Sequence, residues 1–312
     1  MTKQAGFDEL FQQRLSFPDF DAQERFARLV GLDDHKDRLS KILGLLVNPV
    51  GLKAWAEKHH PGSNDILHSV LRRPPLVILA GDVGSGKSEL AETIGDAVAR
   101  QEKIEITLLP MSLLTRGQGR VGEMTQLLSA AFDYTLAEAS KLKSEEGSSR
   151  GAVILLVDEA DALAQSRETA QMHHEDRAGV NAFIRGIDRL ANSRVPAAVI
   201  MCTNRLAALD PALRRRAADI FCFQRPDEEQ RRAALEPTLN QLGFSQTEVD
   251  AIVNATGANK DLGYGFTFSD LIQRLLPRII LDAYPLKAVT ADRALFIAQK
   301  TVPTPPFQDG AA

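Results

Sequence analysis

The sequence has no run approaching the ~20 consecutive apolar residues that a membrane-spanning helix requires. Its first residues also lack the uninterrupted apolar stretch of a secretory signal peptide, because Asp8, Glu9 and Arg14 interrupt them. We therefore expect a cytoplasmic protein without a membrane partner.

An excess of positive charge is also missing, since 37 Lys and Arg face 41 Asp and Glu, for a net charge of -4. Binding to a nucleic-acid backbone is largely phosphate neutralisation by Lys and Arg, so this balance argues against nucleic acid as the main partner. The net charge does not exclude a local basic patch on the surface. Cysteine is scarce too, and Cys202 and Cys222 both lie in apolar, strand-like runs, where we expect small buried thiols without redox or metal chemistry.

Five apolar runs predict buried strands, and three of the segments between them have helical spacing. The strands are expected at 76–80, 104–109, 153–157, 198–202 and 220–223, and the helices at 88–100, 124–142 and 178–190. Strands that alternate with helices are typical of a doubly wound α/β fold, here with a parallel five-stranded sheet.

After Pro226 the strand signal ends and helices are expected at 228–242, 246–255 and 269–283. We therefore expect a short N-terminal segment (1–28), a large α/β domain (29–226), a helical lid domain (227–300) and a disordered tail (301–312).

The first strand runs directly into Gly81-Asp82-Val83-Gly84-Ser85-Gly86-Lys87-Ser88, which matches the phosphate-loop pattern G-x-x-x-x-G-K-[ST] between a strand and a helix. Glycines allow backbone N–H groups to wrap phosphates, Lys87 would reach the β and γ phosphates, and the Ser88 oxygen would hold Mg²⁺. We add Glu89, the next residue, to the expected nucleotide site.

Two carboxylates, Asp158 and Glu159, follow the third strand, at the sheet edge where ligands of α/β proteins bind. We expect Asp158 to hold the magnesium shell and Glu159 to polarise the attacking water. The alternative is a pair of helix-capping acids. Asp161 is expected to cap locally and receives no catalytic role.

Asn204 ends the fourth strand, where it would orient the attacking water, although an asparagine there is often only a turn former. Three adjacent arginines, Arg214, Arg215 and Arg216, follow Asp210-Pro211-Ala212-Leu213. They are either a solvated basic helix end or an arginine finger, a cation that stabilises charge on the γ-phosphate of a neighbouring subunit.

Together these residues resemble the AAA+ ATPases, over residues 29 to about 285. The resemblance also rests on Leu29-Val30-Gly31-Leu32-Asp33-Asp34, Asp158-Glu159-Ala160-Asp161, Leu209-Asp210-Pro211-Ala212-Leu213 and Thr267-Phe268-Ser269-Asp270-Leu271. It implies an adenine pocket at Val30, Gly31 and Leu32, a sensor role for Asn204 and a finger at Arg215 or Arg216. It also implies a hexameric ring that uses ATP and Mg²⁺ to pull on a polypeptide.

Within that family, residues 177–188 and 216–219 are similar to the pachytene-checkpoint ATPases, which remodel HORMA-domain proteins. Bacterial relatives of that branch occur in antiphage operons with a HORMA protein and a cyclic-nucleotide synthase. The resemblance thus implies ATP-driven remodelling of a HORMA-domain protein.

The sequence departs from family unfoldases in the loop at 117–123, which offers Arg120 and Val121 where unfoldases carry an aromatic residue that grips substrate. A second pore loop is expected at 165–176. Its adjacent His173 and His174 are not expected to bind a metal, because sequence neighbours rarely converge on one ion. The lid has Ser269 and Asp270 where some branches place an arginine, so no lid cation is expected at the phosphate.

Two other functions remain open at this stage. One is an ATP-dependent DNA-associated factor of the helicase-loader or initiator type, which shares the same ATPase core but would normally carry a basic module. The other is a nucleotide-gated binding module whose hydrolysis is incidental.

Overall fold

The computed structural model describes residues 7–62, 70–71, 73–113, 123–144, 149–163, 173–258 and 262–307. It divides into two compact units. The sheet unit comprises Met1–Ala27, Asp34–Ala80 and Ser88–Cys222, and the lid unit comprises Arg28–Asp33, Gly81–Lys87 and Phe223–Ala312. Both units are therefore discontinuous in sequence, and the phosphate loop groups with the lid. The contiguous domain boundaries expected from the sequence stay predictions.

The sheet has the strand order β1-β3-β4-β5-β2-β6. Its strands are β1 (Leu15–Phe17), β2 (Leu76–Gly81), β3 (Glu105–Ser112), β4 (Gly151–Asp158), β5 (Ala197–Thr203) and β6 (Asp219–Phe223). Strands β3, β4, β5 and β2 pair in parallel. The expected α/β architecture is confirmed, and the five predicted strands are all present.

The prediction of a five-stranded, purely parallel sheet is wrong by one strand, because β1 adds to β3 in the antiparallel sense. It comes from the segment expected only to precede the core. Three residues before Pro18 are too few for a period-2 pattern to be recognised.

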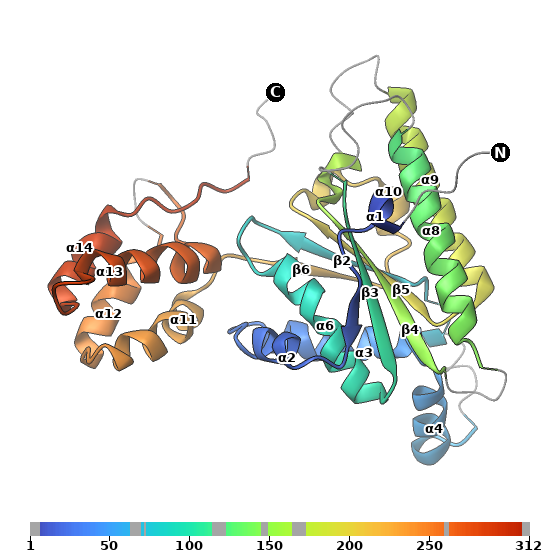
Figure 1. Ribbon diagram of the computed structural model, residues 1–312, viewed down its shortest axis with the longest axis horizontal. Coiled ribbons are helices and arrows are strands. Elements are labelled where there is room, and N and C mark those ends of the chain that lie inside the picture. The colour runs from blue at the N-terminus through green and yellow to red at the C-terminus, as the bar shows by residue number, and fades with distance from the viewer. Residues whose placement is uncertain are drawn as a thin grey trace. The chain divides into compact units, whose positions relative to one another are not determined.

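Helices cover both faces of the sheet (Figure 1). Right-handed crossovers in this strand order place α6 (Lys87–Glu102) on one face, and α8 (Glu123–Leu142) and α9 (His173–Ser193) on the other. Helices α8 and α9 pack side by side, with the rings of Phe132 and Phe183 edge-on at 5.2 Å. The strand residues that point toward α8 and α9 form one apolar core with these two helices, and α6 buries Leu90, Ile94 and Val98 on the other face of the sheet.

Among the described residues of the sheet unit, four further helices were not predicted: α1 (Phe7–Leu10), α2 (Phe20–Ala27), α3 (Asp33–Val47) and α4 (Val50–His59). Short elements follow the strands β4 and β5, namely the 3-10 turns Ala160–Leu163 and Leu206–Ala208 and the helix α10 (Pro211–Arg214). Helix α1 docks on α8 through Phe7, Phe11 and Tyr134, whose ring centroids lie 5.3 to 5.8 Å apart.

The lid unit contains α11 (Glu228–Gln241), α12 (Gln246–Ala255), the π-helical turn Asp270–Leu275, α13 (Leu276–Ala283) and α14 (Ala291–Lys300), the last of which was not predicted. These helices enclose a second apolar core around Leu235, Val253 and Leu275. The expectation of disorder from Thr301 onward does not hold for residues 301–307, because Thr301 is buried and Thr304 hydrogen-bonds Asp270.

Cys202 is buried as expected. The prediction is wrong for Cys222, which is exposed because β6 lies at the sheet edge and alternates between a buried and an open side.

Candidate functional site

The phosphate loop Gly81–Ser88 connects β2 to α6, as the motif requires. Gly81, Gly84 and Gly86 adopt φ values of 152°, 71° and 95°, which other residues rarely adopt. A Cβ on Gly84 would also lie 2.7 Å from Thr267 Oγ1. The glycine spacing of the motif is therefore a steric requirement of this loop.

The Lys87 side chain folds back over that loop and is only 6% exposed. Its Nζ donates to the carbonyls of Gly81 at 3.0 Å and of Asp82 at 2.7 Å, and the Ser85 hydroxyl donates to the same Asp82 carbonyl at 2.7 Å. The structure thus brings the ammonium group, the loop backbone and a hydroxyl together, which is the chemistry a polyphosphate needs.

Residues 28–33 belong to the same compact unit as the loop. Gln230 of α11 donates to the Gly31 carbonyl at 2.8 Å, Leu32 is buried, and a Cβ on Gly86 would lie 3.3 Å from the Leu32 side chain. The segment of Val30, Gly31 and Leu32 therefore lies against the phosphate loop, and an adenine pocket there remains a proposal.

Polar residues collect at the carboxyl edge of the sheet. In the parallel ladders Ser112 lies opposite Asp158, and Ala80, the residue before the phosphate loop, lies opposite Thr203. Because parallel strands end at the same edge, Asp158 and Glu159 lie where the sequence predicted, at the carboxyl edge of the sheet.

Glu159 has an unusual backbone, with φ at 56° in the left-handed region. A non-glycine residue there costs about 1–3 kcal/mol and is concentrated at functional sites. Its N–H donates to Asp158 Oδ1 at 2.7 Å, and the buried Ser112 hydroxyl donates to its carboxylate. Within the part of the chain that the structure describes, neither acid caps the next helix by its side chain, and Ser112, which we did not predict, orients Glu159.

Asp161 organises the end of β5. Only 5% exposed, it accepts hydrogen bonds from Thr203 Oγ1 at 2.5 Å, Asn204 N at 2.9 Å, Asn204 Nδ2 at 2.9 Å and Arg205 N at 3.1 Å. The sequence reasoning gave Asp161 only a local cap, whereas it fixes the Asn204 amide 43 positions away. Its place three residues after Asp158, at the same sheet edge, was the available signal.

The three arginines separate into different environments after α10, which Asp210 caps by accepting from Ala212 N at 2.8 Å. Arg216 forms an ion pair with Asp188 of α9, with Nε 2.9 Å from Oδ1, and this bond raises the pKa of the guanidinium. The Arg214 Nε is buried without a hydrogen-bond partner among the described residues. Arg215 is exposed.

Glu89 has a partner that the sequence did not indicate. Arg25 of α2 donates to both Glu89 oxygens, at 2.7 and 3.0 Å, and to Glu92 at 2.9 Å, and these bonds raise the pKa of Arg25. The structure gives Glu89 a role in attaching α2 to α6, so its assignment to the nucleotide is unsupported.

The expected pore-loop residues Arg120 and Val121 lie outside the described residues, as does most of the second expected pore loop. His173 begins helix α9. Within the described ranges, no cluster of three or more His, Cys, Asp or Glu side chains is arranged to hold a metal, and no helix is long and apolar enough to span a bilayer.

The residues present fit a nucleoside triphosphate with Mg²⁺. The three glycines hold the loop at φ values that other residues rarely adopt, and a Cβ at each would meet neighbouring protein atoms at 3.3 Å or less. The Lys87 ammonium donates to the loop carbonyls. Ser88 and Asp158 offer a hydroxyl and a carboxylate, the oxygen ligands that Mg²⁺ prefers.

Comparison with known proteins identifies relatives of this chain. Residues 77–225 match the family model described as the ATPase family associated with various cellular activities (AAA). The chain is 66% identical to CD-NTase-associated protein 6 of Escherichia coli (strain MS 115-1) over 309 residues, which cover 99% of each chain.

Solved structures match along the whole chain as well. A chain of the E. coli MS115-1 HORMA:CdnC:Trip13 complex superposes with a TM-score of 0.90 at 65% identity, covering 98% of this chain and 100% of that one. Rhizobiales Trip13 superposes with a TM-score of 0.74 at 56% identity, covering 95% and 100%.

Proposed function

The chain belongs to the AAA family of ATPases, among the relatives of CD-NTase-associated protein 6, and from that premise we propose that it uses ATP hydrolysis to remodel a HORMA-domain protein. The observation that carries the proposal is the full-length similarity to a chain solved in a complex with HORMA and CdnC. We further propose that it is a regulator in a bacterial antiphage signalling operon, as the resemblance to the pachytene-checkpoint ATPases implies.

Nucleotide binding falls to the phosphate loop. The backbone of Gly81 to Ser88, with Asp82, Val83, Gly84, Ser85 and Gly86 between them, would surround the phosphates while Lys87 neutralises their charge. Ser88 and Asp158 would hold Mg²⁺, which offsets the negative charge of the β and γ phosphates when bound. The segment Val30 to Leu32 would receive the adenine.

Hydrolysis requires a base and a positioned water. Glu159 would accept a proton from the attacking water, which adds to the γ-phosphorus while the bond to the ADP oxygen breaks, giving ADP and phosphate. Asn204, held by Asp161, would orient that water. The Ser112 hydroxyl keeps the Glu159 carboxylate at the carboxyl edge of the sheet.

The arginine finger is best assigned to Arg215. Arg216 is engaged by Asp188 of its own chain, and the Arg214 Nε is buried, whereas Arg215 is exposed on the surface. A finger acts on a neighbouring subunit, so this assignment requires a homo-oligomer, which we propose to be a hexamer.

The direct test of the chemistry is Glu159→Gln, which keeps the side-chain shape and removes the base. Equilibrium titration should give ATP binding within about twofold of wild type, while phosphate release should fall by about a hundredfold or more. A variant that hydrolyses ATP at the wild-type rate would show that Glu159 is not the base.

Mixing two inactive variants tests the finger. Arg215→Ala subunits retain Glu159, and Glu159→Gln subunits retain Arg215, so mixed interfaces would contain one complete site. Partial recovery of phosphate release on mixing supports a contribution in trans, and no recovery counts against it. Mixing Arg216→Ala with Glu159→Gln is the matched control.

A DNA-associated factor remains the alternative function, because loaders and initiators share this ATPase core. The net charge of -4 opposes it. Salt-dependent DNA affinity together with DNA-stimulated phosphate release would reverse this ranking.

A further inference from the structure

The phosphate loop carries a negative charge of its own, from Asp82 at its second position. The Asp82 carboxylate forms an ion pair with Arg225, with Arg225 Nε 2.7 Å from Asp82 Oδ2. Both side chains are largely removed from water, at 16% and 15% exposure. Since a polyphosphate is itself strongly anionic, this carboxylate lies at a position where an uncompensated charge would oppose binding.

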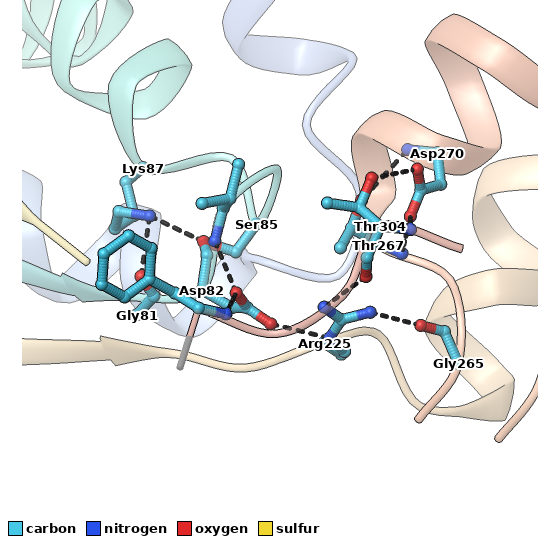
Figure 2. A network of polar contacts seen from close by, with 11 residues as sticks. Gly81, Asp82, Ser85, Lys87, Arg225, Gly265, Thr267, Asp270 and Thr304 are labelled. Carbon is cyan, nitrogen blue, oxygen red and sulfur yellow. Dashed lines mark hydrogen bonds and ion pairs between the residues drawn. The ribbon is translucent and has the colours of Figure 1, made fainter. Parts of the chain in front are cut away.

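Arg225 is held by several partners besides Asp82. Its two terminal nitrogens donate to the carbonyls of Gly265, at 2.5 Å, and Thr304, at 2.7 Å, and the guanidinium lies 4.9 Å from the centre of the Tyr264 ring. Figure 2 shows the guanidinium between Asp82 on one side and Gly265 on the other. Because these bonds fix the Arg225 side chain, its positive charge stays next to the phosphate loop and does not move into solvent.

Residues 301–307, here termed the C-terminal strap, complete the connection. Thr304 donates to Asp270 twice, through Oγ1 at 2.7 Å and N at 2.9 Å, and the Phe307 N–H reaches Asp82 Oδ1 at 3.2 Å. A second arginine, Arg274, bonds Asp270 and Thr304. Arg225 thus contacts both the phosphate loop and the strap, whereas Arg274 contacts the strap and Asp270.

We propose that Arg225 is a positioning residue for nucleotide binding, which neutralises Asp82 and thereby permits an acidic residue in the phosphate loop. The inference rests on the proposed function, since it supposes that this loop binds nucleotide. Asp82 and Arg225 act as a pair, in which each is tolerated because of the other. Removing the cation alone leaves an uncompensated carboxylate in the phosphate loop, while removing both charges does not.

A different result is expected if the ion pair between Asp82 and Arg225 has only a structural role. If the pair mattered only by tying the loop to residues 265–304 of the same unit, Asp82→Asn would weaken nucleotide binding as much as Arg225→Gln. The double variant would then be no better than either single variant.

The test is an equilibrium fluorescence titration of the full chain with mant-ADP and Mg²⁺, on four proteins: wild type, Arg225→Gln, Asp82→Asn and the double variant. Arg225→Gln should weaken binding about tenfold or more, and Asp82→Asn should weaken it by a clearly smaller factor, because the opposing charge is then gone. The double variant should recover to within about threefold of Asp82→Asn. Arg274→Gln, which disturbs the strap without touching the loop, should bind within about twofold of wild type.

Salt gives a second readout, since raising KCl from about 50 to about 500 mM should shrink the defect of Arg225→Gln. A double variant as weak as Arg225→Gln, or a defect that salt does not change, would overturn the inference. If wild type itself failed to bind mant-ADP, the proposed function would fail; if wild type and Arg225→Gln bound equally, only this inference would. A thermal melt of each variant confirms that it is folded.

Discussion

Replacing Asp161 with alanine should reduce ATP turnover through Asn204, without removing any group that contacts nucleotide. The buried Asp161 carboxylate accepts two hydrogen bonds from Asn204, one from the backbone N–H and one from the side-chain amide, both at 2.9 Å. Alanine removes both acceptor oxygens and releases the Asn204 amide, which we propose orients the attacking water.

The expected loss of stability follows from which donors remain unsatisfied. The Thr203 hydroxyl can rotate to another acceptor, and Arg205 N–H also has Thr203 Oγ1 at 3.0 Å. Only the two Asn204 donors lose their partners, and each buried unsatisfied donor costs about 1–3 kcal/mol. Because Asn204 is only half-buried, the two donors together set an upper limit, and the free energy of unfolding should fall by at most about 6 kcal/mol. A displaced Asn204 amide should lower kcat by about ten- to a hundredfold.

The assay is a comparison of phosphate-release kinetics and urea denaturation for wild type, Asp161→Ala, Asn204→Ala and the double variant. If Asp161 acts through Asn204, the double variant should have the kcat of Asn204→Ala, within about twofold. Asp161→Asn, which preserves the shape and can still accept one of the two bonds, should show a smaller loss in both assays.

The reasoning would be refuted by additive losses in kcat, because Asp161 would then act on the reaction independently of Asn204. It would also be refuted if Asp161→Ala lost the predicted stability while its folded fraction kept the wild-type kcat.

Three further predictions concern residues whose partners only the structure reveals. In phosphate-release assays, Arg215→Ala should lower kcat about a hundredfold or more, as expected of a finger, whereas Arg216→Ala should affect kcat less and destabilise the chain by up to about 1 kcal/mol. Glu89→Gln should leave mant-ADP affinity within about twofold of wild type, because its carboxylate binds Arg25, and a larger loss would return Glu89 to the nucleotide site. Burial raises the pKa of Asp270, but hydrogen bonds from Thr304, the Thr267 backbone and Arg274 outweigh it and hold that pKa below its usual value. Ionised Asp270 therefore stabilises the lid unit above pH about 4, and this contribution is lost as the pH falls through the lowered pKa. The urea concentration at the unfolding midpoint should therefore decrease when the pH is lowered below about 4. The decrease should be steeper in wild type than in Asp270→Asn.

The fold was predictable where the signal is local. Apolar runs such as Val153–Val157 identify strands by themselves, and a glycine-rich loop between a strand and a helix identifies a phosphate site with its lysine. The carboxyl edge then follows from topology, because parallel strands must end together, which places Asp158 and Asn204 at one edge before any coordinates are known.

What the sequence could not supply is the pairing of distant polar groups. Arg225 and Asp82 are 143 positions apart, and Arg216 and Asp188 are 28 apart, so no spacing rule connects them. A buried carboxylate such as Asp161 gives the same sequence signal as a helix cap, and only the distant donors that bond to it reveal the difference. Strand β1 was missed for another reason, since its three residues gain their strand character from pairing with β3.

The central claim, that ATP hydrolysis drives remodelling of a HORMA-domain protein, is tested most directly by amide hydrogen exchange of that partner. The HORMA-domain protein proposed as the partner is incubated with the full chain and ATP, and with the Glu159→Gln variant as the matched control. Wild type with ATP should accelerate exchange in normally protected amides of the HORMA domain, and Glu159→Gln should not. Equal exchange with both proteins, or unchanged exchange while wild type consumes ATP, would contradict the account.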